Sequence, residues 1–305
     1  LNKSLIFCII YWEEVYAMTY LKRKIDDFLK GWKANPDRKP LIVKGPRQVG
    51  KTESVRHFAG NIYESIIEIN FIQEPKYRFI TEDGYGAADI VRNISRIDPA
   101  KRFIPGKTLI FFDEIQAHPD IATALKFFRI DGRFDVICSG SLLGISYRQI
   151  ESNSVGYKTD YEMYSLDFEE FLWAKGYDSA LTDDMLLHME TQKAFHSVEM
   201  ATFGNLFLDY CILGGMPAVV REYIRRDTFE ETLDIQRQLI ADYKEDIRKY
   251  AEGLDQARIL NVYNHIPAQL AKENKKFQVS KVASGARFKD YRGCVEWLCD
   301  SGIVN

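Results

Sequence analysis

The sequence has few cysteines, and their spacing gives no sign of a structural framework. The five cysteines are scattered through 305 residues, and no two of them form a C-x₂-C pair. This pattern excludes a disulfide-stabilised fold and does not indicate a zinc site, so a reducing compartment fits best. We expect each cysteine to be a small apolar packing residue. They are Cys8, Cys138, Cys211, Cys294 and Cys299.

A long hydrophobic run near the N-terminus is also missing. The apolar run Leu5–Trp12 contains eight residues, far fewer than the roughly 20 that a membrane-spanning helix needs. The chain does not begin with methionine, and Met18 follows Trp12–Val15, whose codons can contain the ribosome-binding sequence GGAGG. We therefore interpret residues 1–17 as an untranslated leader or a disordered extension, and we expect no membrane partner.

A strong excess of charge of one sign is absent as well. The formal net charge is −3, with 46% hydrophobic and 28% charged residues, which is typical of soluble globular proteins and excludes general disorder. A uniformly basic surface is also excluded, so any contact with nucleic acid needs a local basic patch. The length suits one large domain or two ordinary domains.

Short apolar runs alternate with segments of helical spacing in the first half of the chain. Such runs are typical of strands buried on both faces of a parallel sheet, and the alternation indicates an α/β layer. We expect helices at Met18–Trp32, Thr52–Phe58 and Ile121–Phe128. The predicted strands are Leu41–Val43, Ile66–Phe71, Thr108–Phe112, Phe134–Cys138 and Tyr161–Leu166.

The second half of the chain has a different character. From Phe168 to Ala271 the spacing is helical almost throughout, with a sharp break at Gly214–Pro217. One long amphipathic helix is predicted, with six apolar side chains on a single face. They are Phe229, Leu233, Ile240, Tyr243, Ile247 and Tyr250.

The segment Gly45–Thr52 reads G-P-R-Q-V-G-K-T and matches the phosphate-binding pattern G-x-x-x-x-G-K-[ST]. It follows a predicted strand and opens a predicted helix, which is the context that this pattern requires. Glycines allow the backbone to approach phosphates, and the helix N-terminus favours an anion. We expect Lys51 to reach the β- and γ-phosphates of a nucleotide and Thr52 to bind Mg²⁺. The other residues of the loop are Gly45, Pro46, Arg47, Gln48, Val49 and Gly50.

The apolar run Leu109–Phe112 ends in two carboxylates, Asp113 and Glu114. A buried strand delivers such an acid to the carboxyl edge of the sheet, where ligands bind in open α/β folds. We expect Asp113 to hold Mg²⁺ and Glu114 to orient or deprotonate the attacking water. Alone, the pair would be read as a solvated strand end, but about sixty residues after a P-loop it indicates a Walker-B site.

Two serines, Ser139 and Ser141, follow the next predicted strand. Each is a candidate for the polar group that senses the γ-phosphate, and each is also consistent with an ordinary turn serine. The sequence contains no N-K-x-D guanine-reading signature, which favours ATP over GTP.

Together these motifs resemble a large prokaryotic family of AAA-type P-loop ATPases. The likeness continues through Asp167–Leu172, Gly214–Pro217 and Ile266–Phe277, and it covers nearly all of Met18–Asn305. The resemblance implies a P-loop ATPase core at residues 18–166, a helical lid at 167–228, and a long helix with a winged-helix segment at 229–305. It also implies ATP and Mg²⁺ as cofactors and a homo-oligomer. The C-terminal domain of unknown function in this family contains a winged helix and a restriction-endonuclease-like fold, and the resemblance implies that it is truncated here.

The catalytic arginine of such enzymes is not assigned by the sequence. Many relatives carry Arg or Lys directly after the glycine that corresponds to Gly156, where this chain has Tyr157 and then Lys158. Arg148 lies in the region where AAA proteins place an arginine finger. It is equally consistent with a surface residue of a helix.

The segment Lys272–Arg292 is basic. Two short helices, Val279–Ala286 and Phe288–Asp300, are expected around a glycine turn, with Tyr291, Val295 and Leu298 facing inward. This arrangement suits a winged helix that meets DNA phosphates, and the alternative is a solvated charged face. The basic residues are Lys272, Lys275, Lys276, Lys281, Arg287, Lys289 and Arg292.

Two functions follow from these features. The first is a cytoplasmic, Mg²⁺-dependent ATPase that acts on or with DNA, or within a regulatory or defence system. The second is a nucleotide-dependent switch that hydrolyses ATP slowly and regulates a protein partner. Glu114 favours turnover, whereas the unassigned arginine finger favours the switch.

Overall fold

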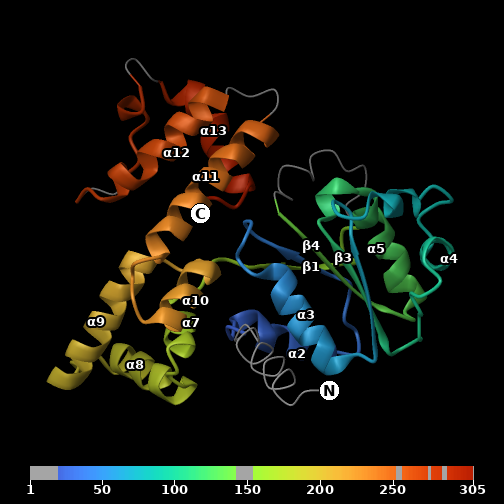
Figure 1. Ribbon diagram of the computed structural model, residues 1–305, viewed down its shortest axis with the longest axis horizontal. Coiled ribbons are helices and arrows are strands. Elements are labelled where there is room, and N and C mark those ends of the chain that lie inside the picture. Colours follow the sequence, from blue (N-terminus) through green and yellow to red (C-terminus); the bar gives the residue numbers. More distant parts are fainter. Residues whose placement is uncertain (1–19, 142–153, 252–255, 274–275, 284–286, 305) are drawn as a thin grey trace, which may run out of the picture.

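The computed structural model of the protein describes residues 20–141, 154–251, 256–273, 276–283 and 287–304. It contains an α/β layer joined to an all-helical region (Figure 1). Residues 1–17, which we interpret as a leader or extension before Met18, lie outside the described residues.

Five parallel strands form one sheet in the order β2-β3-β4-β1-β5. The predicted α/β class with a parallel sheet flanked by helices is therefore confirmed. The strands are β1 (Leu41–Lys44), β2 (Ser65–Asn70), β3 (Thr108–Asp113), β4 (Asp135–Gly140) and β5 (Thr159–Glu162).

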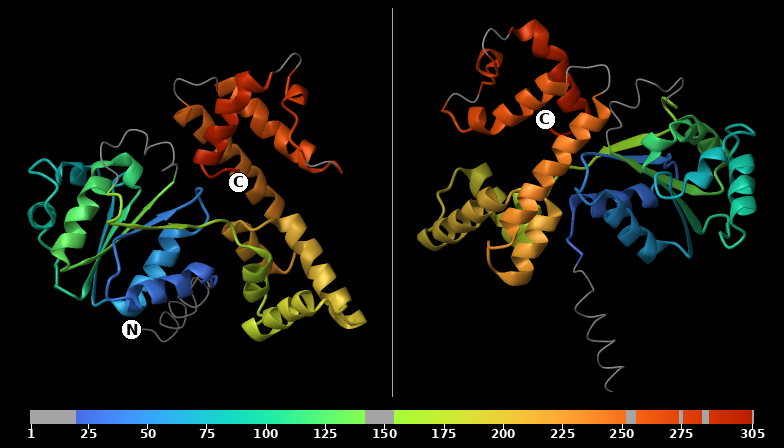
Figure 2. Two further views of the ribbon diagram at one scale, coloured as in Figure 1. Left: turned by 180° about the vertical axis from the view of Figure 1, so that it is seen from behind. Right: turned by 45° about the horizontal axis from the view of Figure 1, so that its top comes forward.

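Helices cover both faces of this sheet (Figure 2). On β3, Leu109 and Phe111 belong to the apolar layer under α2 and α3, whereas Ile110 and Phe112 belong to the layer under α4 and α5. Successive side chains of a strand point to opposite faces, so a strand covered on both sides must be apolar at every position. The helices are α2 (Lys24–Ala34), α3 (Lys51–Ile62), α4 (Ala87–Ile97) and α5 (Asp120–Asp131).

Strand β5 lies earlier in the chain than the predicted Tyr161–Leu166. It is an edge strand of half-exposed or exposed residues, so its apolar pattern is weak. The apolar residues that suggested the later position are buried elsewhere. Met163 packs in the layer under α2 and α3, and Leu166 packs in the helical region.

The segment after β5 passes close to two glycines, and no residue with a Cβ atom fits at either position. A Cβ at Gly45 would lie 1.9 Å from the carbonyl oxygen of Met163, and a Cβ at Gly215 would lie 1.9 Å from that of Leu166. The Leu166 amide in turn donates a hydrogen bond to Gly215 O at 2.7 Å. These backbone approaches bring the start of the P-loop and the break in the helical region to one stretch of chain.

The helical region has two apolar clusters. The first joins α7 to α10 and includes Leu239 of α11, and the second joins the C-terminal part of α11 to α12 and α13. None of the described helices is both long enough and apolar enough to span a membrane. The helices are α7 (Phe168–Ala174), α8 (Ser179–Thr191), α9 (Ser197–Leu213), α10 (Pro217–Arg226), α11 (Thr232–Tyr250), α12 (Gln256–Leu270) and α13 (Phe288–Asp300).

The predicted apolar face of the long helix is wrong in part. Ile247 is buried, but Leu233 and Ile240 are about half exposed, while Leu239 is buried instead. The reason is that α11 changes neighbours along its length, so no single stripe serves both of its clusters. The division at residues 166 and 228 stays a prediction.

The predicted winged-helix segment agrees with the structure in one of its two expected helices. Helix α13 has the predicted bounds, with Tyr291 and Leu298 buried. The predicted helix Val279–Ala286 is wrong over its described residues, because Val279–Lys281 is a 3₁₀ turn that follows α12. The winged helix therefore stays a prediction.

A buried arginine joins the two regions. Helix α7 begins with a capping box in which Asp167 accepts from the Glu170 amide at 2.9 Å. The Glu170 carboxylate is buried and pairs with Arg23 at 3.1 Å. Arg23 also donates to Val49 O of the P-loop and to Tyr164 O, each at 2.7 Å. Because a buried charge needs partners, Arg23 fixes the P-loop relative to α7.

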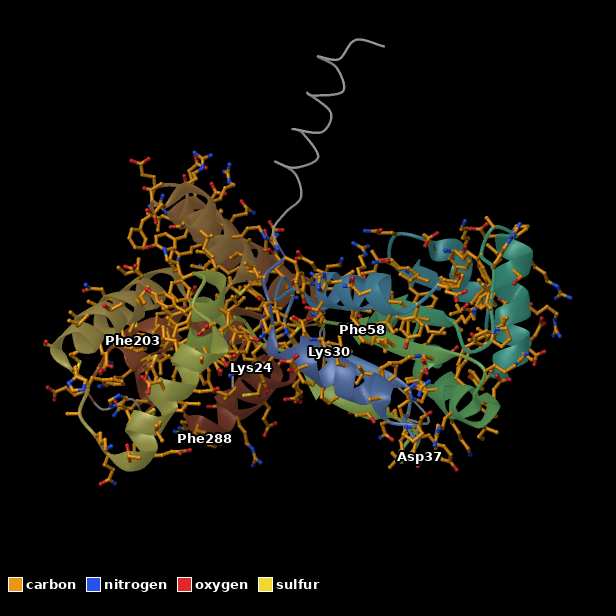
Figure 3. The ribbon with its side chains drawn as sticks, turned by 90° about the horizontal axis from the view of Figure 1, so that it is seen from below. Lys24, Lys30, Asp37, Phe58, Phe203 and Phe288 are labelled. Atoms are coloured by element: carbon orange, nitrogen blue, oxygen red, sulfur yellow. The ribbon has the colours of Figure 1, made fainter. Side chains whose placement is uncertain are left out.

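An exposed lysine reinforces the same junction. Lys24, labelled in Figure 3, lies where α2 meets the helical region, and its Nζ is 2.7 Å from a carboxylate oxygen of Glu169. Both side chains are partly exposed, so this pair adds little stability by itself.

Candidate nucleotide-binding site

The loop between β1 and α3 has the backbone of a phosphate cradle. Gly45, Gln48 and Gly50 have φ values of 141°, 63° and 96°, in the region that L-residues with side chains rarely adopt. Gly50 directly precedes α3, so the open N–H groups of the helix face the loop. A helix N-terminus behind such a loop favours an anion.

Lys51 is the first residue of α3 and is 7% exposed. Its Nζ donates hydrogen bonds to Gly45 O at 2.9 Å and to Pro46 O at 2.6 Å. Burial lowers the pKa of Lys51 to about 8, against the opposing attraction of Glu114 and Asp113. The Lys51 ammonium group is thus hydrogen-bonded to neutral carbonyl groups. A bound phosphate would give it a negatively charged partner.

Asp113 is buried at the end of β3 and gathers donors from three other elements. Its Oδ2 accepts from Thr52 Oγ1 and from Asn70 Nδ2, each at 3.1 Å. Its Oδ1 accepts from Ser139 Oγ and from the Glu114 amide. Because β2, β3 and β4 are adjacent and parallel, their carboxyl ends meet at one edge of the sheet, as expected for this fold class.

Glu114 follows with a strained backbone. Its φ of 56° is in the left-handed region, which costs a residue other than glycine about 1–3 kcal/mol. Its carboxylate accepts from Gln116 Nε2 and lies 3.5 Å from Ser141 Oγ. The strained turn directs the carboxylate along the edge of the sheet, beside Ser141 and away from the bonds of Asp113.

A cavity of about 820 Å³ lies over these residues, within the usual range for ligand pockets. The P-loop and α3 form one wall, and α10 of the helical region forms part of another. Its lining residues are Tyr20, Arg47, Gln48, Gly50, Lys51, Thr52, Glu53, Arg56, His57, Glu114, Pro217, Ala218 and Arg221.

The structure brings together most of the residues that the sequence indicated. Lys51, Thr52 and Glu114 line the cavity, and Asp113 accepts hydrogen bonds from Thr52 and from Ser139. Ser141 lies between Glu114 and Arg47, whose Nε is 3.3 Å from its Oγ. Arg148 falls outside the described residues.

Sequence reasoning missed three residues around the cavity. Arg221 of α10 enters the wall and donates to the Glu53 carboxylate at 2.8 and 2.9 Å. Tyr20 and His57 stack with ring centroids 3.7 Å apart. No local motif marks these positions. Arg221 follows the recognised break at Gly214–Pro217, which is the only local signal for it.

Comparisons with known proteins extend this description. Residues 37–172 match the family model of the AAA domain, and residues 204–305 match a domain of unknown function (DUF8612). A Haemophilus influenzae relative, named as an uncharacterized protein, is 24% identical over 196 residues, which are 62% of this chain and 44% of that protein. The chain thus matches less than half the length of that relative.

A solved structure also shares the fold. The Walker-type ATPase paby2304 of Pyrococcus abyssi matches with a TM-score of 0.56 and 15% identity, covering 93% of this chain and 91% of its own. Drosophila ORC bound to DNA matches with a TM-score of 0.39 and 15% identity, over 90% of this chain and 80% of that one. Along the chain, the match to the AAA domain thus precedes the match to the domain of unknown function.

The buried charge of Lys51 gives a prediction about stability. The pKa of about 8 is below the ordinary 10.5, so the unfolded state binds the proton more tightly between these values and folded stability rises with pH there. Lys51→Met should therefore increase the free energy of unfolding of the nucleotide-free protein at pH 7, by about 1–3 kcal/mol. The gain should shrink as the pH rises from 8 toward 10.5.

Urea denaturation at pH 7 and pH 9.5 measures this difference. Lys30→Met, on the exposed side of α2, is the control and should give a difference that does not depend on pH. A Lys51→Met protein that is less stable than the wild type at pH 7 would contradict the prediction.

Proposed function

We propose that this AAA-domain chain binds ATP with Mg²⁺ and hydrolyses it. The reaction takes place at the carboxyl edge of the sheet, where the P-loop and Asp113 lie. The observation that carries the proposal is the set of donors around Asp113, in which Thr52 from the P-loop helix and Ser139 from β4 meet one buried carboxylate. Lys51 lies beside this set, within the cavity wall.

The oxygen atoms at this edge suit Mg²⁺. Neighbouring ligands of an octahedral Mg²⁺ lie about 3 Å apart, and Thr52 Oγ1 is 3.1 Å from Asp113 Oδ2. A bound ion would supply positive charge to the phosphate oxygens. Thr52 and Asp113 would hold it, with water and the nucleotide filling the remaining positions.

The neighbouring residues have distinct roles in the proposal. Glu114 orients or deprotonates the attacking water, and Ser139 and Ser141 respond to the γ-phosphate. Lys51 leaves its loop carbonyls for the β- and γ-phosphates. Arg221, on the helical side of the cavity, leaves Glu53 for the nucleotide. Homo-oligomerisation, an arginine finger and cytoplasmic location stay predictions.

Two adjacent acids allow the proposal to be tested. Glu114→Gln should retain MgATP binding but hydrolyse ATP about 10²–10⁴ times more slowly, because the change removes a general base and keeps its shape. Asp113→Asn should instead weaken Mg²⁺-dependent binding. Steady-state phosphate release and isothermal titration measure the two properties.

Glu190→Gln, at an exposed position of α8, is the control and should match the wild type in both assays. If Glu114→Gln slows hydrolysis by less than about tenfold, Glu114 is not the water-activating group.

A slow switch is the alternative function. It is favoured by the internal partners of the two cationic side chains, since Lys51 is bonded to its own loop and Arg221 to Glu53. The steady-state rate, measured with and without DNA, separates the two functions. Turnover far slower than about 1 s⁻¹ with intact ATP binding would favour the switch.

We further propose that Lys272–Arg292 contacts DNA phosphates. Support comes from the exposure of its basic residues in the described part of the segment, among them Lys281 and Lys289. Lys275 falls outside the described residues. Each lost phosphate contact makes the log–log salt dependence of binding shallower by about 0.9.

Lys281→Gln combined with Lys289→Gln should therefore reduce the salt slope by up to about two. Fluorescence anisotropy with duplex DNA across a salt series is the measurement. Lys30→Gln combined with Lys107→Gln, both exposed on the α/β layer, should leave the slope unchanged. One common slope for all proteins, or no binding at low salt, would leave the segment a solvated face.

A further inference from the structure

A polar face of α11 lies directly against the P-loop. The Arg47 guanidinium pairs with the Asp246 carboxylate through Nη1, and its Nη2 donates to the Tyr250 hydroxyl at 3.0 Å. The guanidinium also lies over the Tyr250 ring, 5.2 Å from its centroid. Arg47 is the third residue of the phosphate-binding pattern, so a side chain of the cradle itself is held by the helical region.

Two further bonds hold the same loop to the same face of α11. The Tyr243 hydroxyl donates to Arg47 O at 2.8 Å, and Gln48 Nε2 donates to Asp242 Oδ2 at 2.9 Å. Residues three or four positions apart lie on one side of a helix, and Asp246 is four residues after Asp242. The contact is therefore a continuous polar stripe and not an isolated ion pair.

Arg47 also contacts Ser141 at the carboxyl edge of the sheet, close to Glu114. Its Nε is 3.3 Å from Ser141 Oγ, which lies 3.5 Å from the Glu114 carboxylate. One guanidinium thus bridges the group beside the predicted water-activating acid and the acid on α11. An anion that arrives beside Ser141 competes with Asp246 for the same cation.

This competition has a structural consequence because Asp246 is only 6% exposed. A buried carboxylate that loses its cation is strongly disfavoured, so it must become solvated or find another partner. Solvation requires α11 to move away from the P-loop. The adjacent Ile247 and Ala251 pack against α12 and α13, so a movement of this part of α11 would be transmitted to them.

We propose that Arg47, Asp246 and Tyr250 form a latch that holds α11 on the P-loop, and that binding of the γ-phosphate of ATP opens this latch. The proposal rests on the proposed ATP site. ADP lacks the phosphate that reaches Ser141 and leaves the latch closed. The AAA domain would thereby report its nucleotide state to the C-terminal helices. By linkage, a ligand that opens the latch must bind more tightly when the latch is already broken.

Asp246→Asn breaks the ion pair while keeping the shape of the side chain. Its affinity for a non-hydrolysable MgATP analogue should rise about fivefold or more, within the usual range of coupling between sites, whereas its affinity for MgADP should stay within about twofold. Asp234→Asn, on the exposed N-terminal part of the same helix, is the matched control and should change neither affinity. Tyr250→Phe should shift the analogue affinity in the same direction by a smaller factor.

Hydrogen exchange of the wild-type protein tests the latch without any substitution. Amides near Asp246 should exchange faster with the MgATP analogue than with MgADP or without nucleotide. In Asp246→Asn they should exchange fast under all three conditions.

The outcomes separate the two proposals. The latch alone would be overturned if the wild-type protein binds the analogue but its amides near Asp246 exchange at the same rate with the analogue as with MgADP, and if the wild type, Asp246→Asn and Tyr250→Phe bind the analogue equally tightly. Absence of nucleotide binding by the wild-type protein would overturn the proposed function and the latch with it.

Discussion

The buried carboxylate of Asp113 is the interaction on which the site depends. A buried charge is stable only when its oxygens are hydrogen-bonded, and here the donors come from Thr52, Asn70, Ser139 and the Glu114 amide. Satisfying one carboxylate therefore aligns three strand ends with the first turn of α3. The same alignment sets Glu114 directly after Asp113 at this edge of the sheet, so the geometry of the candidate site follows from the stability of the fold.

Close backbone approaches connect this edge to the helical region. The chain after β5 passes so close to Gly45 and Gly215 that no side chain fits at either position. Arg23 adds a buried bridge from the P-loop to Glu170 of α7. Because these contacts involve the P-loop itself, the helical region is in direct contact with the loop. Changes in the loop have a direct physical route to the helices.

Local patterns predicted what local interactions determine. The apolar run of β3 and the glycine pattern of Gly45–Thr52 have strong local signals, because burial on both faces and a phosphate cradle each demand particular residues in sequence. The half-exposed edge strand β5 lacks such a signal, so the predicted position of this strand was wrong. The buried face of α11 could not be predicted, because α11 packs on α7 to α10 at one end and on α12 and α13 at the other. The pairing of Arg47 with Asp246 could not be predicted either, because these residues are about 200 positions apart in the sequence. Arg221 is similar, since only the approach of α10 brings it to the cavity.

We propose that Lys51, Thr52 and Asp113 together bind MgATP. Isothermal titration of the wild-type protein with ATP, once with Mg²⁺ and once with a chelator, measures this binding. We expect one ATP bound per chain and an affinity that falls by about tenfold or more, a loss of at least ~1.4 kcal/mol, when Mg²⁺ is removed. No binding, or binding that is equally tight without Mg²⁺, would contradict it.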